Sequence, residues 1–370
     1  KPDNTGHHEI RHNVISDNGA LGIAAYRSYG TKIIGNVIER NNARGFVSPE
    51  SAGIKAHYFQ GGLIAGNLVR DNDAQGIWLD NRCQNARVTR NVLLRNRGAG
   101  VFVELTTGPI HVDNNVIALT TSTNNLDGDG IYAHDASGVI AAHNLIAHNA
   151  NFGLWAHAAT ERELEYPDAP DKAPARCSNW RVVNNLFVGN HRGAVSLPTE
   201  SPRSRNNVSD FNGFAGAYDH GSGSDYNKPL STARFSINTN KGRVNAEAAD
   251  KWLTLETWRR VTGHDVHSWP MVALRPNFVV GKPLLQLILS DVGEDRELPA
   301  VDGVSRDLLG RRWSPDVRRA GPLTNLRPDA RLTGYDFSEG GDAEVDDPIQ
   351  TTVPMWPLPI TEPSGESETK

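Results

Sequence analysis

The sequence has few of the features that mark several common classes of protein. Its 370 residues include two cysteines, Cys83 and Cys177, which are too few for a disulfide framework and do not have the spacing of a metal site. No apolar run approaches the length of a membrane span. The formal net charge is −5, and the lysines and arginines are scattered, so we expect no basic surface for nucleic acid. We therefore predict no nucleic-acid partner, no membrane partner and no cofactor.

Long amphipathic helices and a leucine framework are also lacking, which argues against alternating strands and helices and against leucine-rich repeats. Instead, a five-residue motif occurs in seven copies within the first two hundred residues. Each copy begins with glycine, and its apolar residues alternate as they do in a strand. The copies are GIAAY at Gly22, GIKAH at Gly53, GIWLD at Gly76, GVFVE at Gly100, GIYAH at Gly130, GLWAH at Gly153 and GAVSL at Gly193.

A second motif, an asparagine followed by two apolar residues, runs in phase with the first. It occurs at Asn13, Asn36, Asn67, Asn91, Asn115, Asn144 and Asn185. Several neighbouring copies of each motif lie 23 or 24 residues apart, and the longer gaps hold polar insertions. Two or three short strands in each such period predict an all-β fold, a right-handed parallel β-helix. The asparagines either bond to their own turn and to the next coil or serve only as turn formers.

The repeat fades after Gly193, which divides the chain into three predicted parts. Residues 1–215 are expected to form the β-helix that carries the functional face. Residues 216–335 are expected to form closing coils and an irregular cap with a short helix near 255–262. Residues 336–370 are acidic and rich in proline and serine, and we expect an extended tail.

One acidic segment has residues of the kind that bind calcium. It is LDGDG, at Leu126–Gly130. It does not have the full ligand spacing of a calcium-binding loop. We therefore interpret it as a turn and predict no metal site, with a bound calcium ion as the alternative.

Alternation along each copy of the five-residue motif separates inward from outward side chains. The second and fourth positions are apolar and should fill the interior, whereas the third and fifth should face outward. The outward side chains form an aromatic column of Trp78, Phe102, Tyr132 and Trp155 and a titratable column of His57, Asp80, Glu104, His134 and His157. Exposed aromatic rings in a row are costly unless something covers them. Rings beside carboxylates suit a carbohydrate ligand, because apolar sugar faces lie against rings.

Asp80 and Glu104 belong to consecutive copies of the motif, so their separation can be predicted. Neighbouring strands lie about 4.8 Å apart, which puts the two carboxyl groups roughly 5 Å apart. Retaining glycosidases hold their carboxyl groups about 5–5.5 Å apart, whereas inverting enzymes need about 6.5–9.5 Å to admit a water. The spacing favours retention. The alternative is that both residues are exposed charges that are neighbours by chance.

Several other side chains flank the two carboxylates. His57 and His134 are expected to bind substrate hydroxyl groups or to orient a carboxylate. Lys55 is either an ion-pair partner of Asp80 or the base of a lyase. His157 lies further along the column, and we interpret it as structural or as a distant substrate contact.

An ordered series of sequence strings in this region resembles a known family. The strings are AGIKAH (52–57), QGIWLD (75–80), QNARVTRNVL (84–93), VFVEL (101–105), and GP and VDNN within 108–115. The series resembles glycoside hydrolase family 120, which consists of β-xylosidases on a right-handed parallel β-helix. The resemblance implies that Asp80 matches the nucleophile and Glu104 the acid/base of a double displacement. His57 and Trp78 match positions of the family pattern and are carried over as substrate contacts.

The sequence departs from the family pattern beside both carboxylates. The tryptophan that follows the aspartate in the family is Asn81 here, and the residues before GP are Thr106 and Thr107, so a histidine near the acid/base is missing. These differences bear on which sugar is bound. The resemblance also implies a secreted or periplasmic protein. The chain opens inside a copy of the repeat (HHEIRHNV), so we expect further coils to precede Lys1.

The predicted function is a retaining glycoside hydrolase that acts from the chain end on xylosides or related plant or marine oligosaccharides. Its predicted catalytic residues are Asp80 and Glu104, and its predicted substrate-binding residues are His57, Trp78, Lys55, Phe102, Tyr132, His134 and Trp155. One alternative is a polysaccharide lyase or epimerase acting on uronate-containing glycans, with Lys55, His57 or Tyr132 as base. Another is a non-catalytic carbohydrate-binding solenoid.

Overall fold

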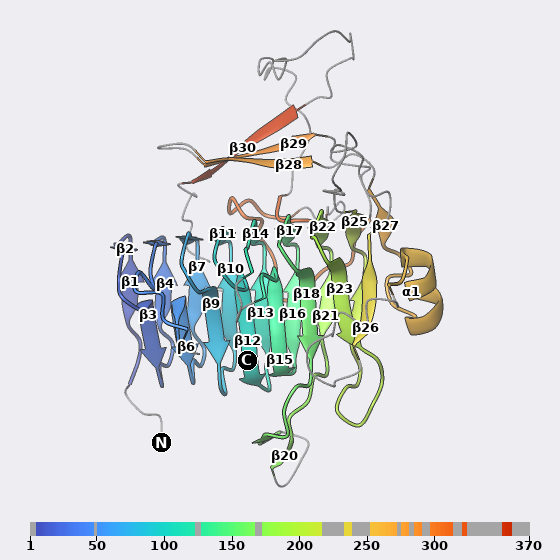
Figure 1. The fold of residues 1–370 in the computed structure, drawn as a ribbon, viewed down its shortest axis with the longest axis horizontal. Coiled ribbons are helices and arrows are strands. Elements are labelled where there is room, and N and C mark those ends of the chain that lie inside the picture. Colours follow the sequence, from blue (N-terminus) through green and yellow to red (C-terminus); the bar gives the residue numbers. More distant parts are fainter. Residues whose placement is uncertain are drawn as a thin grey trace.

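The described part of the chain is a solenoid of parallel strands (Figure 1). The structure is a computed structural model that describes residues 5–47, 50–122, 127–166, 172–216, 233–238, 252–271, 275–280, 285–290, 297–313, 320–323 and 350–356. Each coil contributes one short strand to each of three parallel sheets. The prediction of an all-β, right-handed parallel β-helix is confirmed.

The strands of each sheet recur at every coil along the chain. The first sheet contains β1 (Glu9–Arg11), β4 (Lys32–Ile34), β7 (Leu63–Ala65), β10 (Ala86–Thr89), β13 (Ile110–Asp113), β16 (Val139–Ala142), β21 (Arg181–Val183) and β24 (Val208–Asp210). The second contains β2 (Val14–Ser16), β5 (Val37–Glu39), β8 (Leu68–Arg70), β11 (Val92–Leu94), β14 (Val116–Ala118), β17 (Leu145–Ala147), β22 (Leu186–Val188), β25 (Gly213–Ala215) and β27 (Trp269–Pro270).

The third sheet carries the five-residue motif, and we call it the motif sheet. Its strands are β3 (Leu21–Tyr26), β6 (Ala52–His57), β9 (Gln75–Asp80), β12 (Val101–Thr106), β15 (Ile131–Ala136), β18 (Phe152–His157), β23 (Gly193–Pro198) and β26 (Phe235–Asn238). The inward positions are apolar and inaccessible to solvent, as predicted, for example Ile77 and Leu79. The leading glycines allow close stacking of coils, since a Cβ on Gly76 would lie 2.5 Å from the carbonyl oxygen of Gly100.

The asparagine motif forms a ladder in the buried corner between the first and second sheets. Asn91 Nδ2 donates to the carbonyl oxygen of Thr89 in its own turn and to Oδ1 of Asn115 in the next coil, each at 3.0 Å. The interpretation that these asparagines bond both within and between coils is confirmed. A second ladder, in which Asn72 Nδ2 donates to Asn96 Oδ1 at 2.9 Å, was not predicted.

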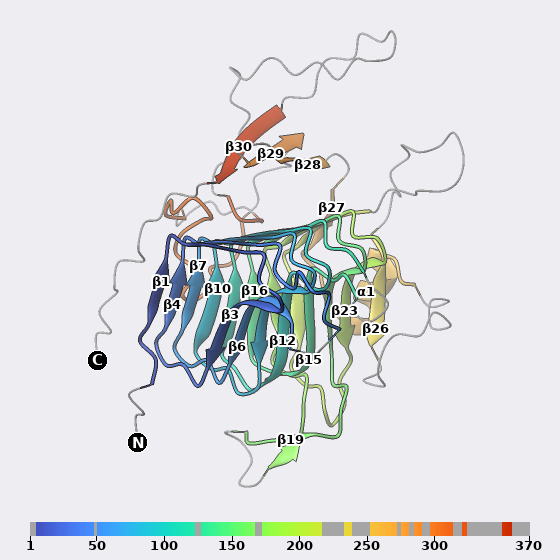
Figure 2. The ribbon, with the colours of Figure 1, turned by 60° about the vertical axis from the view of Figure 1, so that its left-hand side comes forward.

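Further elements extend or adjoin the solenoid. The predicted short helix is confirmed as α1 (Leu255–Thr262), which begins after the N-cap Thr254, ends at Gly263 with φ 71°, and lies beside β26 (Figure 1). Two strands, β19 (Glu163–Leu164) and β20 (Ala173–Pro174), pair in the insertion that follows β18 and project from the solenoid (Figure 2). The remaining strands, β28 (Arg275–Val280), β29 (Leu285–Ser290) and β30 (Gln350–Trp356), form an antiparallel sheet.

The predicted tail is only partly described. Within 336–370, residues 350–356 form β30, and the remainder lies outside the described residues. In the described part of the chain, no helix has the length and apolar character that crossing a membrane requires.

Candidate functional site

Four polar side chains lie at matching positions of adjacent strands in the motif sheet, and we call them the polar row. The register pairs His57 of β6 with Asp80 of β9, Asp80 with Glu104 of β12, and Glu104 with His134 of β15. The predicted adjacency of the two carboxylates is confirmed. Their backbones are therefore separated by the distance between neighbouring strands, about 4.8 Å.

Asp80 is held by two nitrogen donors from β6. Lys55 Nζ lies 3.0 Å and His57 Nε2 2.9 Å from the same oxygen, Oδ2 of Asp80. The ion pair between Lys55 and Asp80, one of the two interpretations from the sequence, is confirmed. Lys55 is itself buried, and its Nζ lies 2.8 Å from Oε2 of Glu50 and 3.4 Å from the ring centre of Trp78.

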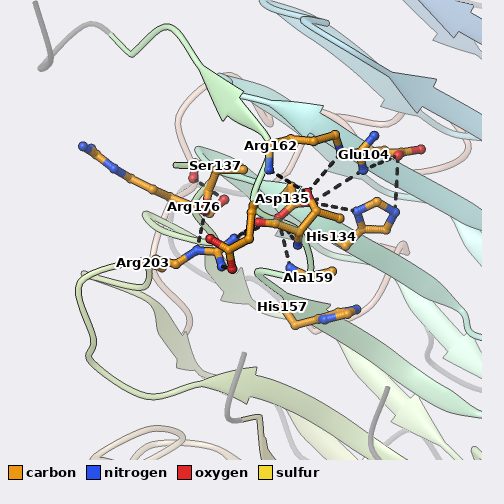
Figure 3. Close-up of polar contacts among 12 residues, drawn as sticks. Glu104, His134, Asp135, Ser137, His157, Ala159, Arg162, Arg176 and Arg203 are labelled. Carbon is orange, nitrogen blue, oxygen red and sulfur yellow. Dashed lines mark hydrogen bonds and ion pairs between the residues drawn. The ribbon is translucent and has the colours of Figure 1, made fainter. Parts of the chain in front are cut away.

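Glu104 is held from the opposite side. Arg162 Nη2 donates to its Oε1 at 2.9 Å, and His134 Nε2 lies 3.4 Å from the same oxygen. Figure 3 shows the side chain of Arg162 reaching Glu104 from outside the motif sheet. Sequence reasoning missed Arg162, because it lies 58 residues beyond Glu104 in an insertion that looks like a polar loop.

The contacts of each carboxylate converge on one of its oxygens. Asp80 is held through Oδ2 and Glu104 through Oε1. The two side chains are 9% and 10% exposed, respectively. Each carboxylate is thus fixed at one oxygen, while the other can engage a bound molecule.

The aromatic column is not the open platform that the sequence predicted. Trp78 and Phe102 are each 5% exposed and Trp155 is 1% exposed, while Tyr132 is half-buried. The rings cover one another, with centres 4.9 Å apart for Trp78 and Phe102, 4.8 Å for Phe102 and Tyr132, and 5.1 Å for Tyr132 and Trp155. Alternation gives the direction of a side chain but not what covers it, so the expected exposure was wrong. The aromatic column thus packs beside the polar row and does not offer an open surface to a ligand.

His157 is buried within this column. It stacks on Trp155 with ring centres 4.7 Å apart, and its Nε2 lies 3.2 Å from the hydroxyl of Tyr132. Burial, with a smaller effect of His134, lowers the pKa of His157 from 6.5 to about 3, although Asp135 acts in the opposite direction. The imidazole is therefore neutral in the folded protein, which favours the structural interpretation.

The pKa of His157 makes a prediction for stability against acid. Because its folded pKa lies below its unfolded pKa, the unfolded state binds more protons between pH 6.5 and about 3. Stability is therefore complete above pH 6.5 and is lost as the pH falls, by at most about 1.4 kcal/mol per pH unit from this group. We expect His157→Phe to flatten this dependence in urea unfolding measured above the range where carboxylates titrate. The exposed His8→Phe is the control, and parallel curves for His157→Phe and the wild type would contradict the prediction.

Asp135, which follows His134, is a second residue that the sequence did not single out. Its side chain is inaccessible to solvent and lies 3.2 Å from His134 Nδ1. Burial acts to raise its pKa, but hydrogen bonds from His134 and Thr160 outweigh burial and bring the pKa to about 2. The copy GIYAH continues with an aspartate where GLWAH continues with an alanine, and this difference was the available signal.

The acidic segment at 126–130 shows a structural role in its described part. Asp129 is buried, and its Oδ1 accepts from Asn151 Nδ2 at 2.8 Å and from the backbone N–H of Phe152 at 3.0 Å. Leu126 lies outside the described residues. Among the described residues, no group of three or more His, Cys, Asp or Glu is arranged to hold a metal ion.

The departures from the family pattern also have partners in the structure. Thr106 Oγ1 donates to the carbonyl oxygen of Cys83, and Thr107 Oγ1 accepts from Gln84 Nε2 at 2.8 Å. Asn81 has φ 46°, a left-handed conformation that asparagine tolerates. Both threonine side chains are thus tied to the neighbouring coil.

Comparison with known proteins supports the fold. Residues 3–120 match the family described as right handed beta helix region. A search of curated protein sequences found no match. Among solved structures, XylC, determined in complex with xylose, is 17% identical with a TM-score of 0.61, and the match covers 95% of this chain and 52% of that chain.

Two further solved structures match over shorter stretches. A mutant of the periplasmic alginate epimerase AlgG is 19% identical with a TM-score of 0.44, covering 55% of this chain and 45% of that chain. The A-module of the mannuronan C-5 epimerase AlgE4 from Azotobacter vinelandii is 14% identical with a TM-score of 0.40, covering 71% and 57%. The chain spans about half the length of the XylC chain, at 52%, and at these identities the likeness shows the fold, a right-handed parallel β-helix.

Proposed function

We propose that this protein is a retaining glycoside hydrolase, with Asp80 as nucleophile and Glu104 as general acid and base. The observation that carries the proposal is the pairing of these two carboxylates on adjacent strands, each held by nitrogen atoms that converge on one oxygen. Carboxyl groups at the spacing of adjacent strands match the separation of about 5–5.5 Å found in retaining enzymes.

The two carboxylates have different roles in the proposed reaction. Asp80 Oδ1 attacks the anomeric carbon and forms a glycosyl–enzyme ester, while Glu104 transfers its proton to the departing glycosidic oxygen. The ionised Glu104 then removes a proton from a water, which attacks the same carbon and releases Asp80. Lys55 and His57 support the role of Asp80, because both hold its Oδ2 and so fix the orientation in which Oδ1 attacks.

We propose xylosides as the substrate class. The family resemblance of the strings around Asp80 and Glu104 supports this choice, as does the xylose bound by XylC, a protein of the same fold. His57 and His134 are proposed to bind hydroxyl groups of the sugar, since their side chains are 23% and 14% exposed at the two ends of the polar row. Trp78, Phe102, Tyr132 and Trp155 are proposed to shape the site mainly through their packing. We propose a secreted or periplasmic location, as the family resemblance implies.

A polysaccharide lyase or epimerase is the second candidate function. The observation that favours it is the gathering of Lys55, His57 and Arg162 around the polar row, because a uronate substrate needs its carboxylate neutralised and a base beside it. In the structure these side chains already contact Asp80 and Glu104, which favours the hydrolase.

Turnover of a panel of nitrophenyl glycosides tests the proposed function. We expect the wild-type protein to release nitrophenol from the β-xyloside and to form no unsaturated, ultraviolet-absorbing product from uronate-containing glycans. An unsaturated product would favour the lyase. Sugar binding without any turnover would favour a non-catalytic solenoid, and either result would contradict the proposal.

A further inference from the structure

We propose that Arg162 is a positioning residue for Glu104 and that the segment carrying it, anchored on Asp135, is part of the active site. We call residues 158–166 and 172–178 the arm. The inference rests on the proposed function, because it assigns Arg162 a part in the acid catalysis by Glu104. The sequence showed the arm only as a polar insertion between two copies of the repeat.

The first residues of the arm are fixed to a buried carboxylate. Asp135 Oδ1 accepts from the backbone N–H of Ala159 at 2.9 Å (Figure 3). Its Oδ2 accepts from Thr160 Oγ1 at 2.6 Å. Arg203 adds a second attachment, because it donates to the carbonyl oxygens of Thr160 and Ala175 on both sides of the arm. A buried carboxylate whose partners are mostly groups of one segment holds that segment in place.

The rest of the arm contacts residues that closely follow the two carboxylates in the chain. Leu164, Tyr166 and Ala175 form a small apolar cluster with Leu105, which directly follows Glu104. Further out, Glu165 Oε1 lies 3.9 Å from Arg82 Nη2, beyond the strand that carries Asp80. A segment that follows β18 therefore contacts residues at the C-terminal ends of β12 and β9, the two strands that carry the carboxylate pair.

Arg162 is the point at which the arm meets Glu104. Its Nε donates to Thr160 Oγ1 at 3.0 Å, which orients the guanidinium, and its Nη2 donates to Glu104 Oε1 at 2.9 Å. The same Nη2 lies 3.6 Å from Oδ2 of Asp135, so the guanidinium bridges the anchor and the acid/base (Figure 3). Partly exposed ion pairs contribute little to stability. The buried anchor instead points to a geometric role.

The positioning role of Arg162 follows from its contact with Oε1 of Glu104. With Oε1 fixed by Arg162 and His134, the carboxyl group of Glu104 cannot rotate freely, and Oε2 keeps one orientation for proton transfer. Without Arg162 the carboxyl group samples other orientations and proton donation becomes less efficient. The loss should be large for a leaving group that needs a proton and small for one that does not.

Leaving-group dependence separates this role from a merely structural one. The probes are phenyl β-xyloside, whose leaving group needs protonation, and 2,4-dinitrophenyl β-xyloside, whose leaving group does not. For Arg162→Ala we expect kcat/KM to fall about 10- to 100-fold with the phenyl substrate, a part of the 10²–10⁴-fold that a general acid supplies. With the dinitrophenyl substrate we expect kcat/KM to change by less than about 3-fold, because little acid catalysis is required.

Arg97→Ala is the matched control. Arg97 also makes an ion pair, with Nη1 2.6 Å from Asp73 Oδ1, and its side chain is 53% exposed against 45% for Arg162. We expect this variant to resemble the wild type on both substrates. Thr160→Val, which removes the hydroxyl that joins Asp135 to Arg162, should change the two rates in the same direction as Arg162→Ala but by less.

The outcomes distinguish the inference from the proposed function. Equal losses on both substrates for Arg162→Ala, or no loss on either, would overturn the positioning role while leaving the hydrolase intact. A wild-type protein that cleaves neither xyloside would overturn both. Loss on the phenyl substrate alone, with Arg97→Ala unchanged, supports the role.

Discussion

Replacement of Asp80 by alanine is expected to reduce kcat on nitrophenyl β-xyloside by roughly 10⁴-fold or more, as removal of a nucleophile does in other hydrolases. The physical reason is that no glycosyl–enzyme ester can form. Asp80 is the carboxylate with two nitrogen donors at a single oxygen, Oδ2, and with Oδ1 left for attack. Steady-state kinetics measures the effect, and circular dichroism checks that the solenoid remains folded.

A control for this variant lies in the turn between β8 and β9, before the strand that carries Asp80. Asp73 also pairs with a cationic side chain, that of Arg97, and is 33% exposed. Asp73→Ala should keep wild-type activity, because the proposed site does not include it. If Asp80→Ala turned over the substrate at the wild-type rate, Asp80 could not be the nucleophile.

Replacement of Glu104 by alanine is expected to show two separable effects. On phenyl β-xyloside, kcat/KM should fall about 10²–10⁴-fold, because the leaving oxygen receives no proton. On 2,4-dinitrophenyl β-xyloside, formation of the glycosyl–enzyme should be nearly unchanged, and its hydrolysis should be slow because the water has no base. Azide needs no base, so its addition should restore turnover and yield a glycosyl azide.

The azide experiment distinguishes Glu104 from Asp80. Azide should accelerate Glu104→Ala with the dinitrophenyl substrate and should not produce the same retained glycosyl azide with Asp80→Ala. A Glu104→Ala variant that lost activity equally on both substrates, with no response to azide, would show that Glu104 is not the acid/base.

The repeat predicted most of the fold for a clear physical reason. Stacked coils place equivalent positions of each copy beside one another, so the sequence spacing already implied the register of Asp80 with Glu104. The same logic implied the asparagine ladder, in which Asn91 bonds to Asn115. The helix at Leu255–Thr262 was predictable because its sequence departs from the repeat and ends at a glycine.

The parts of the candidate site that the sequence did not predict depend on contacts outside the repeat. Arg162 reaches Glu104 from an insertion, and periodicity gives no information about where an insertion returns. The burial of Trp78 and Phe102 depends on their stacking with each other and on Lys55 above Trp78. Side-chain direction follows from alternation along a strand, but burial follows from packing between coils and loops.

The cationic contacts of the two carboxylates fit the proposed glycoside hydrolysis. Cationic side chains hold the carboxylate pair from its two ends, Lys55 on the side of Asp80 and Arg162 on the side of Glu104. The coils supply one cation and an insertion supplies the other. The repeat thus sets the spacing of the carboxylates, while the arm is proposed to set the orientation of the acid/base.

Covalent trapping tests the central claim most directly. The wild-type protein would be incubated with 2,4-dinitrophenyl 2-deoxy-2-fluoro-β-xyloside, which forms a glycosyl–enzyme that hydrolyses slowly because the fluorine destabilises the transition state. Peptide mass spectrometry then locates the added sugar. We predict one fluoroxylosyl group on Asp80, within the peptide that contains GIWLD. Turnover without any covalent adduct, or an adduct on a residue other than Asp80, would contradict it.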